Sequence, residues 1–123
     1  MIKDVLIVGC GGFVGTCLRF FVNQMCFRLG LVSFPVSTFV VNIVGCFLIG
    51  LLGGLSERAG WANPTACLFL MTGLCGGFTT FSAFANEIWT MGAKGELLTA
   101  SVYAMASVAV GIVCVWLGRH IAV

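Results

Sequence analysis

The chain has 123 residues, of which 60% are hydrophobic and only 8% are charged, and its formal net charge is +2. In soluble domains roughly a quarter of all residues are charged, so this composition excludes an ordinary soluble globular protein. The six basic and four acidic residues are scattered singly, which excludes a basic nucleic-acid-binding surface and a charge-rich disordered chain. The composition is that of a membrane protein.

Four apolar segments are long enough to cross a bilayer as helices, since about 20 helical residues span roughly 30 Å of hydrocarbon. We predict spans at residues 5–27, 34–55, 61–91 and 97–118. The connections between them are short and leave no room for a soluble domain. We therefore expect a single all-α membrane domain over residues 1–123.

The first span begins with VLIVGCGGFVG, which imitates the glycine turn of a dinucleotide-binding domain. The spacing does not fit, because the third glycine position falls on Val14 and no acidic residue follows at the distance that a ribose requires. We interpret these glycines as a surface for close helix packing in the membrane. Pairs of small residues four positions apart recur along the chain: Gly11 and Gly15, Gly50 and Gly54, Gly73 and Gly77, Ser107 and Gly111.

The seven cysteines and the single histidine do not form a recognisable site. No CxxC occurs, and nearly all the cysteines lie inside apolar runs. We interpret them as small buried hydrophobic residues. His120 is far from any partner that could complete a metal site, so we expect no zinc.

The second span places Thr38 and Asn42 on one helical face. Polar side chains inside a membrane are costly unless they face protein or a water-filled path. The Asn42 amide offers two donors and one acceptor. Two interpretations stay open: a hydrogen bond that joins two helices, or a donor that lines an anion path.

The third span is longer than one straight crossing needs, and it contains Gly73, Gly76 and Gly77 followed by Thr79 and Thr80. This sequence predicts a helix that is broken inside the membrane, with backbone carbonyl oxygens freed from the helical pattern. Such backbone persists only where it is buried in protein or coordinates something. Freed carbonyls suit a hard monovalent cation; the alternative is a glycine kink satisfied by neighbouring hydroxyls.

Phe81 and Phe84 follow the break on one helical face, with Glu87 three residues further on. A phenyl ring has a positive edge, so rings that present their edges can attract an anion without a formal charge. Paired phenylalanines at this spacing are also typical of core packing. In the fourth span Tyr103 and Ser107 form a thin hydroxyl stripe, which fits either a polar path or a packing seam.

Charges at the ends of the spans specify orientation only weakly. Lys3, Arg58 and Arg119 lie at one side, and Arg28 and Lys94 lie at the other, joined by Arg19 if its side chain extends that way. Orientation follows the imbalance of Lys and Arg, which is small here. We predict insertion in both orientations, so that two copies can meet antiparallel. A four-helix bundle fills its own interior, so an ion pathway is expected at the interface of a homodimer.

Three motifs together resemble the CrcB or Fluc family of fluoride channels: GGFVGTCLRF at 11–20, STFVVNIVGCFLIG at 37–50 and GLCGGFTTFSAF at 73–84. The resemblance covers the full length. It implies a membrane protein of the cell (inner) membrane that exports fluoride passively and is not an enzyme. It also implies an antiparallel dual-topology homodimer with two pores, surrounded by lipid, and a structural sodium ion at the centre of the interface.

The resemblance also assigns roles to individual residues. Gly76 and Thr79 would bind the sodium through backbone carbonyls. Phe81 and Phe84 would present ring edges to fluoride, and the remaining pore positions would be Asn42 as a donor, Arg19 as an attractor of anions, Thr38, Tyr103 and Ser107 as a polar track, and Glu87 as an acidic position near the pore. The chain departs from the family at Ala83 and Gly111, where neither residue offers a hydroxyl.

The alternative is a small dual-topology multidrug exporter, which also uses four short helices in an antiparallel dimer. Such exporters carry a membrane-embedded glutamate in the first helix. Here the first span has no acidic residue beyond Asp4 at its start. The sequence therefore favours the channel.

Overall fold

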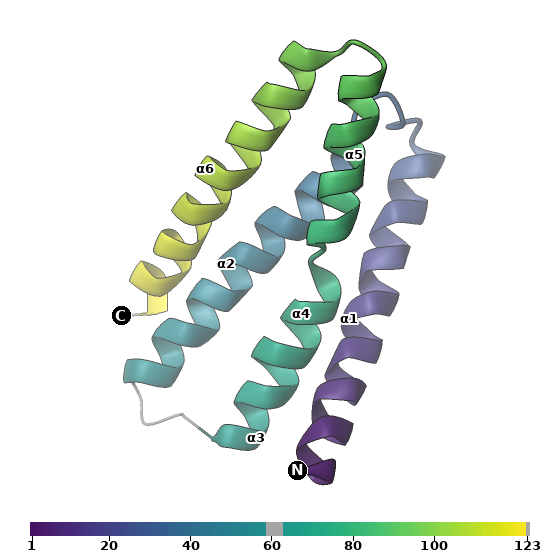
Figure 1. The fold of residues 1–123 in the computed structure, drawn as a ribbon. Coiled ribbons are helices and arrows are strands. Elements are labelled where there is room, and N and C mark those ends of the chain that lie inside the picture. Colours follow the sequence, from purple (N-terminus) through teal and green to yellow (C-terminus); the bar gives the residue numbers. More distant parts are fainter. Residues whose placement is uncertain (59–62, 123) are drawn as a thin grey trace.

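The computed structural model describes residues 1–58 and 63–122, and all of their regular structure is helical. The third span is built from several consecutive pieces, with an interruption between α4 and α5 (Figure 1). One piece, η1, has the wider turns of a π-helix. In chain order the elements are α1 (Ile2–Arg28), α2 (Val36–Arg58), α3 (Pro64–Cys67), η1 (Leu68–Cys75), α4 (Gly76–Phe78), α5 (Phe81–Ala93) and α6 (Leu97–Ala122).

Four candidate membrane spans are confirmed: Ile2–Arg28, Val36–Arg58, Pro64–Ala93 and Leu97–Ala122. All four helices end one to four residues beyond the predicted ends, and the second begins at Val36, two residues after its predicted start. The predicted start of the third span at residue 61 lies outside the described residues. The described part of that span begins at Pro64, after Asn63 caps the helix by accepting a hydrogen bond from the Thr65 amide at 3.0 Å.

The predicted break in the third span is confirmed, but it falls on the threonines and not on the glycines. Gly73, Gly76 and Gly77 are helical, whereas Thr79 and Thr80 have extended backbones with ψ angles of 161° and 120°. The helix then restarts at α5, where the Thr80 hydroxyl accepts a hydrogen bond from the Ala83 amide. Serine and threonine are favoured at this capping position because they satisfy a free amide of the first turn.

The helices form two closely packed pairs: α1 packs against η1 and α4, and α2 packs against α6 (Figure 1). Glycines make both contacts possible. A Cβ atom at Gly15 would overlap the Leu74 carbonyl oxygen, and one at Gly50 would overlap the Val115 carbonyl oxygen. The predicted role of the small-residue pairs in close packing is therefore confirmed for these two helix pairs.

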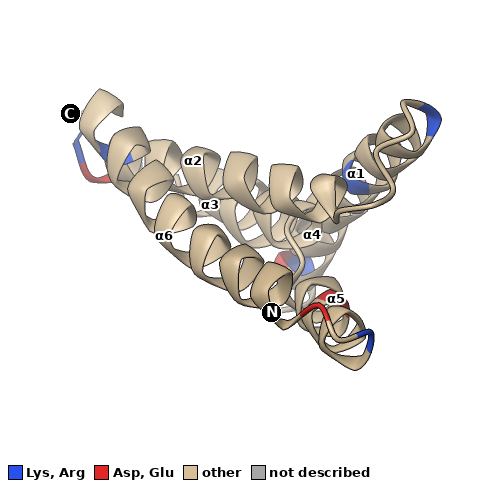
Figure 2. Cartoon of the chain, turned by 90° about the horizontal axis from the view of Figure 1, so that it is seen from above, with Lys and Arg blue, Asp and Glu red and all other residues tan. Residues whose placement is uncertain are grey.

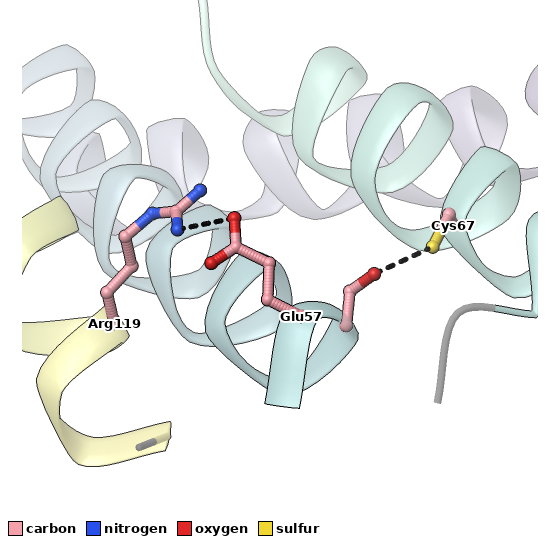
Figure 3. A network of polar contacts seen from close by, with 4 residues as sticks. Glu57, Cys67 and Arg119 are labelled. Atoms are coloured by element: carbon pink, nitrogen blue, oxygen red, sulfur yellow. Dashed lines mark hydrogen bonds and ion pairs between the residues drawn. The ribbon is translucent and has the colours of Figure 1, made fainter. Parts of the chain in front are cut away.

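The charged residues lie mainly toward the ends of the helices (Figure 2). The start of α1 and the ends of α2 and α6 lie at one end of the molecule, opposite the end of α1 and the α5–α6 connection (Figure 1). Arg119 Nη1 forms an ion pair with Glu57 Oε1 at 2.8 Å (Figure 3), and Arg58 Nη1 donates to the Ala122 carbonyl oxygen at 2.9 Å. These contacts fasten the ends of α2 and α6 together.

Candidate functional site

A groove of about 500 Å³, which we call the central groove, runs beside the break in the third span. Its walls come from α2, η1, α5 and α6 and are mostly apolar. Six residues predicted as site residues line it: Asn42, Gly76, Thr79, Phe81, Phe84 and Ser107. The structure therefore brings together the two phenylalanines, the amide and both residues predicted to bind sodium.

Phe81 and Phe84 contact each other but have different surroundings. Their ring centroids are 5.9 Å apart, with the rings tilted by 49°. Phe84 is half-buried and packs against Tyr103, with centroids 5.2 Å apart. Phe81 is 78% exposed in the single chain. Core packing within the chain therefore accounts for Phe84 but not for Phe81.

Asn42 binds the main chain of Thr80 at the break. Its Nδ2 donates to the Thr80 carbonyl oxygen at 3.1 Å, and its Oδ1 accepts from the Thr80 amide at 2.8 Å. The extended backbone of Thr80 would otherwise leave these groups without helical partners. One of the two N–H donors of Asn42 remains for another acceptor. The geometry thus contains the interhelical hydrogen bond and leaves a donor beside the central groove.

Glu87 lies away from the central groove and accepts two hydrogen bonds from hydroxyl groups. The Thr38 hydroxyl donates to Oε2 at 2.6 Å, and the Tyr103 hydroxyl donates to Oε1 at 2.9 Å. Thr38 and Tyr103 are both buried. Hydrogen bonds to a carboxylate are stronger than those between neutral groups, so the three side chains join α2, α5 and α6.

A second cavity of about 260 Å³, which we call the inner polar pocket, is lined by three further predicted site residues: Arg19, Thr38 and Glu87. Arg19 projects from α1, and its Nε donates to the Gly77 carbonyl oxygen at 3.1 Å. That carbonyl is one that the break at Thr79 and Thr80 frees from the helical pattern. The pocket is lined by Thr16, Arg19, Phe20, Asn23, Ser37, Thr38, Val41, Thr80, Ala83 and Glu87.

Ser107 is the one residue among those described whose side chain has a buried oxygen or nitrogen without a hydrogen-bond partner. Ser107 lines the central groove. Buried polar groups in folded proteins are nearly always paired. No hydrogen bond joins Ser107 to the group formed by Thr38, Tyr103 and Glu87. The sequence pattern had placed Ser107 on one stripe with Tyr103.

Gly76 and Thr79, the two residues predicted to bind sodium, lie on either side of Gly77 and Phe78, just before and at the break in the third span. Both line the central groove, and nothing lies within 4 Å of the position that a Cβ of Gly76 would occupy. The Thr79 hydroxyl and amide both donate to the Cys75 carbonyl oxygen, at 2.9 and 3.0 Å, which holds the last helical turn before the break. Within residues 1–58 and 63–122 no cluster of three or more His, Cys, Asp or Glu residues could hold a metal.

Three residues of this region were not predicted as site residues. Thr80 caps α5 and is held by Asn42, and Ser37 donates from its hydroxyl to Asn23 Oδ1 at 2.9 Å. Threonine is favoured at the capping position before a helix, so the sequence does contain a signal for the role of Thr80. The pairing of Asn23 with Ser37 depends on how α1 packs against α2, and no local pattern encodes it.

These features define a small four-helix membrane protein with a broken third span and polar side chains gathered around the break. Residues 6–119 match the family described as "CrcB-like protein, Camphor Resistance (CrcB)", and the chain belongs to this family. It is 41% identical over 118 residues to "Fluoride-specific ion channel FluC" of Azobacteroides pseudotrichonymphae, covering 96% of this chain and 94% of that protein. Proteins with the same description from Methylobacillus flagellatus and Chlorobium luteolum are 43% and 46% identical, covering 94% of this chain and 91% and 88% of theirs.

Proposed function

We propose that this protein is a fluoride-specific channel that lets fluoride leave the cell passively. The observation that carries the proposal is the similarity over nearly the whole chain to proteins described as fluoride-specific ion channels. The site is chemically suited to the task. Fluoride is small and strongly hydrated, so a path must replace its water with amide, hydroxyl and ring-edge contacts.

We assign the pore residues as follows. Phe81 and Phe84 present ring edges to the anion, and Asn42 offers its remaining N–H beside them. Arg19 attracts anions into the inner polar pocket, where Glu87 lies close to the path. Thr38, Tyr103 and Ser107 supply hydroxyl groups. In support, the central groove and the inner polar pocket contain these residues except Tyr103, which touches Phe84.

The functional unit is an antiparallel dual-topology homodimer with two pores at its interface. The near-even charge at the two ends supports insertion in both orientations. Phe81 is exposed and lies with Asn42 on the central groove, so a second copy that covers this groove would also cover the ring. A symmetric dimer is the commonest assembly of identical chains.

The centre of the interface holds a sodium ion. Gly76 and Thr79 of each copy would supply four backbone carbonyl oxygens, and hard cations prefer oxygen ligands. When bound, the ion supplies positive charge that offsets the negative charge of the passing anions and links the two copies. The place of both residues on the central groove supports this assignment.

The test is fluoride efflux from proteoliposomes that contain the purified protein, measured with a fluoride electrode. Rapid fluoride release, with no release of chloride in matched vesicles, is the expected result. A multidrug exporter would instead exchange protons for an organic cation, and α1 has only Asp4 in its first turn as an acidic residue. Vesicles that retain fluoride would overturn the proposal.

A further inference from the structure

Two polar cavities meet at one end of the molecule. The outer polar pocket, of about 480 Å³, lies among the end of α1, the α1–α2 connection and the end of α5. The inner polar pocket lies deeper, between α1, α2 and α5. Asn23, Ser37 and Glu87 line both cavities. These three side chains form the wall that the two cavities share.

The hydrogen bond between Ser37 and Asn23 determines which end of the Asn23 amide is available. Because Oδ1 accepts from the Ser37 hydroxyl at 2.9 Å, the acceptor end of the amide is occupied. The two N–H donors of Nδ2 have no protein partner among the hydrogen bonds of the described residues. Asn23 is also exposed, so its donors are reachable from water.

Arg19 lies one helical turn before Asn23 on α1 and lines the inner polar pocket. Its Nε is bound to the Gly77 carbonyl oxygen, which fixes the guanidinium and leaves its other nitrogens for an anion. Residues four apart on a helix lie on one face. The α1 wall therefore presents two successive donor groups, the Asn23 amide first and the Arg19 guanidinium deeper.

The other charges around these cavities do not provide a competing anion site at the junction. Lys94 and Glu96 both line the outer polar pocket and carry opposite charges. Glu87, on the opposite wall from α1, is acidic, and its two oxygens already accept from Thr38 and Tyr103. Lys94 lines only the outer pocket, so the hydrogen-bond donors at the junction itself come from the α1 side.

We propose that Asn23, oriented by Ser37, is an outer anion-binding position of this chain, where an incoming anion first exchanges water for a protein donor before it reaches Arg19. The inference rests on the proposed function, since it gives the fluoride path a definite entrance. It predicts that Asn23 affects how well fluoride is captured at low concentration.

The test compares Asn23→Asp with Gln24→Glu in proteoliposomes across a range of fluoride concentrations. Asn23→Asp keeps the acceptor for Ser37 but replaces the donors by a carboxylate, and we expect flux at low fluoride to fall by about tenfold or more, because like charges in contact repel strongly. Gln24 is the adjacent residue and lines only the outer pocket. Its variant adds the same charge to the outer pocket but not to the wall that both cavities share, and we expect a clearly smaller loss of flux than in Asn23→Asp, because an exposed charge is screened by salt.

Ser37→Ala adds no charge and leaves the Asn23 amide free to rotate. We expect a smaller loss, of about two- to threefold at low fluoride, that disappears at saturating fluoride, because only the orientation of a neutral hydrogen-bond donor is lost. If Asn23→Asp does not fold, Ser37→Ala provides the test: parent-like flux of Ser37→Ala at low fluoride would then contradict the inference. Parent-like flux of Asn23→Asp at low fluoride, or an equal loss in Gln24→Glu, would overturn the inference while leaving the channel function intact. An impermeable parent protein would instead refute the proposed function.

Discussion

Phe81 and Phe84 lie one turn apart, yet the structure gives them separable roles. Phe81 is largely exposed in the chain, whereas Phe84 packs against Tyr103. We expect Phe81→Ile to abolish fluoride efflux without loss of folded protein, because isoleucine keeps bulk but lacks the positive ring edge. Fluoride efflux and thermal unfolding in detergent measure the two effects.

Phe84→Ile is the matched comparison for that variant. It removes the same kind of ring from a packed position, so it should lower both efflux and the free energy of unfolding, the latter by about 1–3 kcal/mol. Full efflux in Phe81→Ile would return Phe81 to a packing role. Equal destabilisation of both variants would contradict the distinction drawn from their burial.

Asn42 is the residue for which stability and transport should change together. Asn42→Asp keeps an acceptor for the Thr80 amide but places a carboxylate oxygen near the Thr80 carbonyl oxygen, where Nδ2 now donates at 3.1 Å. Removing one partner of a buried hydrogen bond costs about 1–3 kcal/mol. We expect lower unfolding temperature and blocked fluoride flux, because the added charge repels the anion. Undiminished flux would remove Asn42 from the pore.

At the scale of the elements, close packing of α1 against η1 and α4 depends on the absence of a side chain at Gly15. A Cβ there would meet the Leu74 carbonyl oxygen and lie 2.8 Å from the Phe78 amide nitrogen. Gly15→Ala should therefore separate the two elements and cost about 1–3 kcal/mol of stability. Unfolding in detergent, followed by circular dichroism, measures the change.

Gly12→Ala is a control on the same helix. A Cβ at Gly12 has only the Gly73 carbonyl oxygen nearby, at 3.8 Å, which is an ordinary contact. Alanine is also a better helix former than glycine by about 1 kcal/mol. We expect this variant to be as stable as the parent or slightly more stable. Equal losses in both variants would mean that glycine acts here through something other than close approach to η1.

The third span shows how far sequence reasoning reaches at this scale. Its break was predictable because glycine and threonine runs are poor helix formers. The position of the break was not, because Gly73 and Gly77 pack against α1 within the helix, while Asn42 binds the main chain of Thr80 in an extended conformation. The π-helical turns of η1 were not predictable either, because no local sequence pattern indicates them. Tertiary contacts determine at which of several poor helix-forming residues the helix is interrupted.

The candidate site was predictable in its residue types more than in its grouping. Polar and aromatic residues inside apolar spans identified most of it, since each is costly there without a purpose. The division into two cavities was not predictable, because Glu87 follows Phe84 by three residues but faces Thr38 and Tyr103 on other helices. The Asn23–Ser37 pair was missed because it depends on the contact between α1 and α2.

For the whole molecule, orientation in the membrane can be measured with single cysteines. Arg58→Cys and Lys94→Cys lie at opposite ends, and all seven native cysteines lie within the helices, so labelling by a membrane-impermeant maleimide can be compared with the parent. We expect each variant to label to about half on intact cells, because the end charges set no single orientation. Complete labelling of one variant and none of the other would contradict dual insertion.

Asn42 forms hydrogen bonds only with main-chain atoms of Thr80, so positions 42 and 80 differ in which side chains they can accept. Every residue except proline carries the amide and carbonyl that Asn42 requires at position 80. At position 42 the side chain must place a donor and an acceptor side by side at one length, which among the common amino acids only asparagine does. The contact with Asn42 therefore leaves the side chain at position 80 open, and that side chain is constrained instead by the cap that the Thr80 hydroxyl forms with the Ala83 amide. A replacement at position 42, in contrast, has no compensating change available at position 80.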